Sequence, residues 1–184
     1  MLLSHLTFGK SVDRTLSAAM AHWTLPYGRH GISEKAVVST FGAGYLLVER
    51  NCYRRRIYYQ PESDVWIQFN FDSEETGLSL DRYELVQLYI SKKSFHCPRF
   101  VPTRRIGMSA SLLQCFGKSI PEVKAEFFKQ RWNEPRANAG AMRNRYLPSA
   151  GGVSLRPAIQ DGKVLTAEFF FNKGKLAVIM IQSL

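Results

Sequence analysis

Two stretches of this chain follow the same order of residue types, and an internal repeat constrains a fold more than composition does. Residues 31–42 read Gly-Ile-Ser, a few residues, a Val-Val pair and, after two more residues, Phe-Gly. Residues 107–117 read Gly-Met-Ser, a shorter spacer, a Leu-Leu pair and, again after two residues, Phe-Gly. Each stretch is followed by a Phe-rich segment, 66–72 or 167–172, and then by another apolar segment. We therefore expect two diverged copies of one unit.

The repeated stretch has the signals of a short helix. Ser33 and Ser109 stand where an N-cap side chain would accept hydrogen bonds from free helix amides, and the glycine after each Phe supplies a left-handed stop. Residues 119–122 read Ser-Ile-Pro-Glu, a capping box that predicts a helix through about Trp132. Apolar residues at helical spacing predict one more helix over residues 11–23.

Alternation of side chains with period two predicts antiparallel strands. In residues 65–71 the odd positions carry Val, Ile, Phe and Phe, whereas the even positions carry Trp, Gln and Asn. Strands are also expected over residues 53–59 and 83–90, and a hairpin that turns at Asn172-Lys173-Gly174 should end the chain. Residues 133–160 lack periodicity, so we expect an irregular insertion there, which is usually functional or mobile.

These elements predict an α+β protein of two tandem helix–antiparallel-sheet units, with short helices packed on one face of the sheet. The first unit is expected over residues 1–95 and the second, with the irregular insertion, over residues 96–184. The charge supports this division, because residues 1–91 hold 9 basic and 10 acidic side chains and residues 92–184 hold 16 and 5. A strongly basic half attracts polyanions or an acidic protein surface, or it only keeps the protein soluble.

Composition excludes some classes of protein and leaves the compartment open. No apolar run approaches the ~18 residues of a membrane-spanning helix. The N-terminus lacks the basic region of a signal peptide, so a cytoplasmic protein is expected, or a periplasmic one if this chain is a mature form. Cys52, Cys97 and Cys115 are odd in number and have no CxxC spacing, which favours a reducing compartment and leaves one disulfide possible.

The chain carries no motif of catalysis or of cofactor binding. Gly-Lys-Ser occurs at residues 9–11 and 117–119, but neither copy has the upstream glycine that a phosphate-binding loop requires. The four histidines have no metal-ligand spacing, and His96 beside Cys97 does not make a catalytic pair, because a nucleophile and its base normally meet through the fold. We expect no enzymatic activity, no metal and no cofactor.

The residues that favour a binding function are aromatic, Arg and Gln side chains on the strands of the first half. Tyr, Trp and Arg are the types most enriched in binding hot spots. If the strands are neighbours, these side chains would form one open face; the alternative is that helices cover the face and the aromatics belong to the core. The expected partner-binding residues are Arg54, Arg56, Tyr58, Trp66, Gln68, Tyr83, Gln87 and Tyr89, with Arg136, Arg143 and Arg145 in the insertion.

The Gly-Met-Ser start, the Leu-Leu-x-x-Phe-Gly helix end and the Phe-rich terminal hairpin resemble the small helix–sheet unit of β-lactamase-inhibitor proteins and of SmpA/OmlA-type outer-membrane assembly lipoproteins. Residues 107–117 and 165–182 carry this resemblance best, and 31–42 with 65–90 carry it more loosely. The insertion departs from the pattern, and the lipobox of the lipoproteins is absent. The resemblance implies two units whose continuous concave sheet grips a partner protein.

Two functions remain after these exclusions. The first is a protein-binding inhibitor or immunity-type protein that neutralises a partner enzyme or toxin through the aromatic sheet face. The second is a nucleic-acid-binding protein that uses the basic second half, in which Arg and aromatic side chains stack on unpaired bases. A structural or secretion-accessory protein of the same fold cannot be separated from the first by sequence.

Overall fold

The computed structural model describes most of the chain. The helix expected over residues 11–23 lies outside the described residues. Within the described part, no helix has the length and apolar character needed to cross a membrane. The described residues are 32–49, 53–72, 83–128, 130–137, 152–158 and 165–183.

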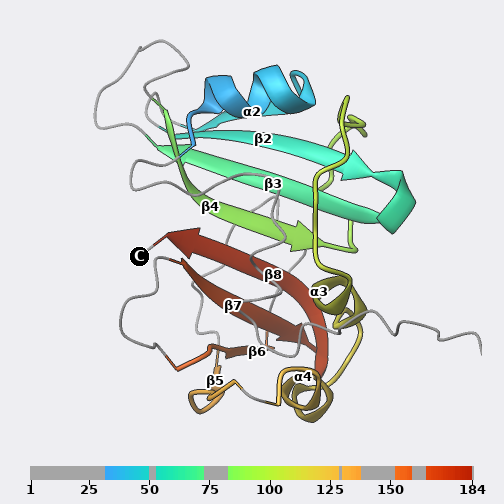
Figure 1. Cartoon of the computed structure of the whole chain (residues 1–184), viewed down its shortest axis with the longest axis vertical. Helices are drawn as coiled ribbons and strands as arrows, with labels where there is room; N and C mark the ends of the chain where they lie inside the picture. The colour runs from blue at the N-terminus through green and yellow to red at the C-terminus, as the bar shows by residue number, and fades with distance from the viewer. Residues whose placement is uncertain are drawn as a thin grey trace, which may run out of the picture.

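One eight-stranded antiparallel sheet forms the body of the protein (Figure 1). The strand order is β1-β2-β3-β4-β8-β7-β6-β5, so the first and second halves of the chain meet where β4 pairs with β8. The strands are β1 (Tyr45–Glu49), β2 (Tyr53–Gln60), β3 (Val65–Asp72), β4 (Glu84–Ser91), β5 (Arg136–Ala137), β6 (Gly152–Leu155), β7 (Leu165–Asn172) and β8 (Lys175–Ser183).

The described α-helices are short, and their apolar residues pack on one face of the sheet. Helix α2 (Glu34–Phe41) begins at Ser33, whose side chain accepts a hydrogen bond from the amide of Ala36 at 3.2 Å. Helix α3 (Ala110–Gln114) begins in the same way at Ser109. Helix α4 (Ile120–Glu126) has the expected capping box, in which Glu122 accepts from the Ser119 amide at 2.7 Å.

The expectation of two tandem α+β units is wrong. The continuous sheet and the short helices make the described structure nearer to an all-β fold. The physical reason is the pairing of β4 with β8, which runs from Gln87↔Gln182 to Ser91↔Val178. Leu88, Ile90 and their partners are apolar, so pairing buries both strands at the centre of one sheet instead of leaving two separate sheets.

The two faces of the sheet carry separate apolar clusters. The helix-covered face holds the larger one, built from odd residues of β3 such as Phe69 and from residues of all three α-helices. The opposite face holds a smaller one around Trp66, Tyr89 and Met180. The alternation expected for β3 is therefore confirmed, but both of its faces are buried.

Several boundaries differ from the sequence-based expectation. Strands β5 and β6 lie inside the segment predicted to be irregular, and β1 was not predicted at all. Helix α4 ends at Glu126 rather than near Trp132, because Phe127 leaves the helical conformation (φ −111°, ψ 53°). The closing hairpin is confirmed: Lys173 and Gly174 both have positive φ, as a tight two-residue turn requires.

Candidate functional site

The side chains predicted to form one open face lie on two opposite faces of the sheet. Cross-strand partners share a face, and Arg54 pairs with Phe71, Arg56 with Phe69 and Tyr58 with Ile67. These residues of β2 therefore belong to the helix-covered face. Tyr83 is buried there too, because a register shift between β3 and β4 reverses the alternation at the start of β4. Trp66, Gln68, Gln87 and Tyr89 lie on the opposite face.

Arg54 and Arg56 of β2 hold helix α2 on the sheet instead of facing a partner. The side chain of Glu34, the first residue of α2, is fully buried between them. Arg56 Nε donates a hydrogen bond to Glu34 Oε1 at 2.6 Å, and Arg54 Nε forms an ion pair with Glu34 Oε2 at 2.6 Å. Arg56 Nη1 also donates to the carbonyl of Ala43, just beyond the helix, at 2.8 Å. Sequence reasoning did not identify Glu34 as their partner.

Tyr58 closes the other end of α2. Its hydroxyl donates to the carbonyl of Gly42 at 2.7 Å, and its ring packs edge-on against Phe41 and Phe69. Burial raises the pKa of the Tyr58 hydroxyl well above its usual value. The residue is therefore a neutral, structural hydrogen-bond donor.

The opposite face carries a ladder of amide side chains, of which Gln68 and Asn70 are buried and Gln87 and Gln182 are half-buried. Gln68 Nε2 donates to Asn70 Oδ1 at 2.7 Å, and the chain of contacts continues to Gln87 and Gln182 at 3.5 Å each. Tyr89 donates its hydroxyl proton to Gln87 Oε1 at 2.9 Å. These bonds link β3, β4 and β8, so the polar residues of this face stabilise the middle of the sheet.

The aromatic residues of this face are also part of the core. Trp66 and Tyr89 are almost fully buried, and Trp66 packs edge-on against Phe95 at a centroid distance of 6.3 Å. The open aromatic face that the sequence predicts is therefore not present. Of the three arginines expected in the insertion, Arg136 is exposed on β5, and Arg143 and Arg145 lie outside the described residues.

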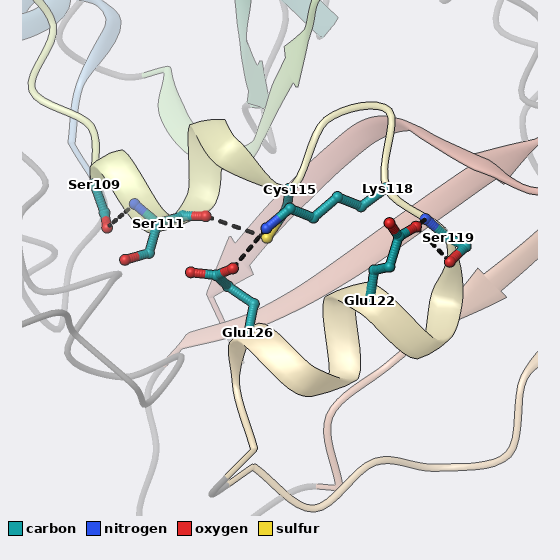
Figure 2. Close-up of polar contacts among 7 residues, drawn as sticks. All are labelled: Ser109, Ser111, Cys115, Lys118, Ser119, Glu122 and Glu126. Carbon is teal, nitrogen blue, oxygen red and sulfur yellow. Dashed lines mark hydrogen bonds and ion pairs between the residues drawn. The ribbon is translucent and has the colours of Figure 1, made fainter.

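A second polar cluster lies where α3 and α4 come close together (Figure 2). Cys115 Sγ donates to the carbonyl of Ser111 at 3.2 Å, and burial raises the pKa of its thiol to about 12. Lys118 and Glu126 form an ion pair at 2.6 Å. A thiol that stays protonated is a poor nucleophile, so Cys115 has a structural role, and the Lys118–Glu126 ion pair ties the connection after α3 to α4.

Exposed apolar side chains identify a different surface, at the β1 edge of the sheet. The described residues include five large apolar side chains that are exposed, and all but Phe128 lie at this edge. Leu46 (37%) and Val48 (52%) belong to β1, and Phe100 (42%) and Val101 (59%) belong to the connection after β4. We call these four residues the apolar edge. Leu46 and Val48 lie opposite Arg56 and Arg54, on the helix-covered side of this edge, whereas the ring of Phe100 lies 6.0 Å from that of Tyr45, on the other side.

The connection that contributes Phe100 and Val101, residues 92–106, passes from one face of the sheet to the other; we call it the basic strap (Figure 1). Phe95 anchors its start in the cluster around Trp66. At its middle, the carbonyl of Phe100 accepts from the amide of Tyr59 at 2.8 Å. At its end Ile106 donates its amide hydrogen to Gln60 Oε1 and packs in the larger core. The strap is therefore held in place without regular secondary structure.

The basic strap has five basic side chains and no acidic one. All five are exposed, and none forms an ion pair in the described part of the chain. One of them, Arg99, lies over the ring of Tyr59 at 4.5 Å from its centroid. The basic residues are Lys92, Lys93, Arg99, Arg104 and Arg105.

The charge of residues 92–106 is the sequence signal that could have identified this surface. Residues 92–106 have five positive charges in fifteen positions, with Phe and Val between them, and this run stands out from the other loops of the chain. The described residues contain no group of three or more side chains able to hold a metal ion.

Comparison with known proteins gives no relative. No family model matches the chain, and searches of the curated proteins and of the solved structures find no match. The resemblance to β-lactamase-inhibitor proteins accordingly stays a prediction.

Proposed function

We propose that this protein binds another protein, in the manner of an inhibitor or immunity-type protein that covers an enzyme or a toxin, and that the contact is made by the apolar edge and the basic strap. The observation that supports this proposal is that four of the five exposed large apolar side chains of the described residues lie on edge strand β1 and on the strap, whose five basic side chains form no ion pair with any described residue. An apolar centre with a charged rim is the usual anatomy of a protein interface.

The positive charge gives the partner a chemical character. The five basic side chains of the strap form no ion pair with a described residue, and they favour an acidic surface, which would steer the encounter and compensate the charge on binding. Arg54 and Arg56 of β2 take no part in this contact, because Glu34 neutralises them inside the protein. The proposal covers a partner in the cytoplasm or, as the alternative, in the periplasm.

A second candidate function is the binding of single-stranded nucleic acid by the same strap. The observation that favours it is the position of Arg99 and Phe100 next to each other, with Arg99 over the Tyr59 ring. Bases stack on exposed aromatic and guanidinium groups, and phosphates attract lysine and arginine. The two functions differ in the partner that is captured and in the effect of salt.

Photo-crosslinking in the cells that produce the protein tests the proposal. A benzoylphenylalanine replaces Val101 in one variant and Phe128 in the matched control, since the two side chains are similarly exposed and Phe128 follows helix α4, away from the strap in the chain. We expect a discrete protein adduct from position 101 and none from position 128. Equal adducts from both positions, or a nuclease-sensitive adduct from position 101, would overturn the proposal.

Salt then separates the two candidates with purified components. For an acidic protein partner, rising salt slows association and leaves dissociation nearly constant. For nucleic acid, affinity falls by about 0.7 to 0.9 log units per phosphate contact for each log unit of salt.

A further inference from the structure

We infer that the partner adds an extended segment to the edge of β1 that no described strand covers, as one more strand of the sheet, and places acidic side chains on the basic strap. This inference rests on the proposed function and specifies how the contact is made. It follows from the direction of the backbone groups of β1, from the exposure of its side chains and from the charge beside it.

The backbone direction in β1 follows from one hydrogen bond. The amide of Tyr59 donates to Phe100 in the strap, so it points away from β3 and toward the side of β2 on which β1 lies. Amide direction alternates along a strand, and the β2–β3 register is continuous, so Ile57 and Arg55 point the same way. Their partners in β1, Tyr45 and Leu47, must therefore use their own backbone groups to pair with β2.

The residues between them point outward. Leu46 and Val48 direct their N–H and C=O groups away from β2, to the edge of the sheet, and neither has a partner in the part of the chain that the structure describes. Their side chains are also the exposed ones of the strand. Residues 45–48 contain no charge and no proline, the two devices that usually block pairing at a sheet edge.

The strap continues this edge and gives it a charge. Because Phe100 pairs with Tyr59, the strap lies along β2 just beyond the start of β1, and the Phe100 ring is 6.0 Å from that of Tyr45. A segment added to β1 would therefore reach the strap at the Tyr45 end. There it would meet the exposed basic side chains of the strap, so acidic residues at that end of the segment are favoured.

Charge also decides against a second copy of this chain as the occupant. Each copy has a net charge of +10, and a second copy would bring no acidic surplus to the strap. The opposite edge of the sheet is a poorer site, since β5 has only two residues and begins with Arg136. The occupant that fits is an extended, partly acidic segment of a different protein.

Random peptides of about twelve residues displayed on phage provide the probe. We expect the enriched peptides to alternate apolar and polar residues and to carry Asp or Glu at one end. A synthetic copy of the tightest binder is then N-methylated at one position at a time. Strand addition predicts that binding falls about tenfold or more at every second position and little at the positions between, because only alternate amides face β1. This pattern requires no change in the protein itself.

Two variants of the protein complete the test. Val48→Pro removes one outward N–H and leaves the pairing with β2 intact, so it should weaken peptide binding about tenfold. Val48→Thr keeps that N–H and is the matched control, with an expected loss of about threefold from the missing apolar contact. Unchanged binding to Val48→Pro, loss at consecutive N-methylated positions or the absence of enriched peptides would each overturn the inference.

Binding of the protein captured by crosslinking separates a failure of strand addition from a failure of the proposed function. If that partner binds Val48→Pro as tightly as the wild type, strand addition is wrong and the protein-binding function stands. If position 101 yields no protein adduct, the proposed function falls and the inference falls with it.

Discussion

Replacement of Glu34 by Gln should destabilise the protein strongly, although the residue lies on a helix that a sequence-based reading would treat as ordinary. The Glu34 carboxylate accepts from Arg56 Nε at 2.6 Å and contacts Arg54 Nε at 2.6 Å. Both arginine side chains are largely buried, with 9% and 18% of their surface exposed, and Glu34 is fully buried. Neutralising Glu34 therefore leaves two buried positive charges without their counter-charge.

The size of the effect follows from this geometry. Removal of one partner from a buried ion pair costs about 3–5 kcal/mol, because the remaining charge stays desolvated. Gln keeps an oxygen that can accept from one arginine, so we expect the lower end, about 3 kcal/mol. With a urea m-value of about 2 kcal/mol per molar, the unfolding midpoint should fall by about 1.5 M.

Urea unfolding followed by far-UV circular dichroism measures this change. Glu84→Gln is the matched control, because Glu84 is exposed on β4 and forms no ion pair in the described part of the chain. Its expected cost is below about 0.5 kcal/mol. A cost below about 1 kcal/mol for Glu34→Gln would refute the claim that the ion pairs hold α2 on the sheet.

Two further substitutions and one labelling experiment test the remaining structural assignments. Trp66→Ala should lower the free energy of unfolding by about 3–5 kcal/mol, as expected for a core residue. A loss below about 1 kcal/mol, measured by urea unfolding, would mean that Trp66 lies on an open face. Gly44→Ala should lower stability by about 1–3 kcal/mol, since φ is +61° and the new Cβ would lie 2.7 Å from the Tyr58 ring; an unchanged midpoint would disprove that close approach. Burial raises the pKa values of the Cys115 and Cys97 thiols to about 12 and about 11. Iodoacetamide should therefore label both thiols slowly at pH 8 and faster as the pH rises toward those values. Labelling at pH 8 at the rate of the unfolded chain would contradict the protonated state of the thiols.

Local signals in the sequence predicted local structure well. The caps at Ser33 and Ser109, the capping box at Ser119 and the turn at Gly174 each depend on a few neighbouring residues, and the structure confirms them. The alternation of β3 was also predicted correctly, because successive side chains of a strand point to opposite faces in any sheet.

Long-range pairing was not available from the same signals. Alternation tells which residues of a strand share a face, but it does not tell which face of the next strand joins them. Arg54 and Arg56 were therefore assigned to the face of Trp66, whereas the register places them opposite Phe71 and Phe69. The pairing of β4 with β8 likewise depends on strands 95 residues apart at Gln87 and Gln182, and it turned the expected separate units into one sheet.

The candidate surface was missed for a related reason. Tyr45, Leu46, Leu47 and Val48 form a continuous apolar run without alternation, and such a run gives no indication that it ends a sheet. Its exposure follows only from its place in the strand order. The basic charge of the strap was visible in the sequence, but its position beside β1 required the hydrogen bond between Tyr59 and Phe100.

Amide hydrogen exchange measured by NMR tests the central claim that β1 is an open edge available to a partner. In the free protein the amides of Leu46 and Val48 should exchange at least about tenfold faster than that of Leu47, because only the Leu47 amide pairs with β2. On addition of the crosslinked partner or of the tightest displayed peptide, the Leu46 and Val48 amides should slow to the rate of Leu47. Equal protection of all three amides in the free protein, or no slowing at Leu46 and Val48 in the complex, would contradict the account.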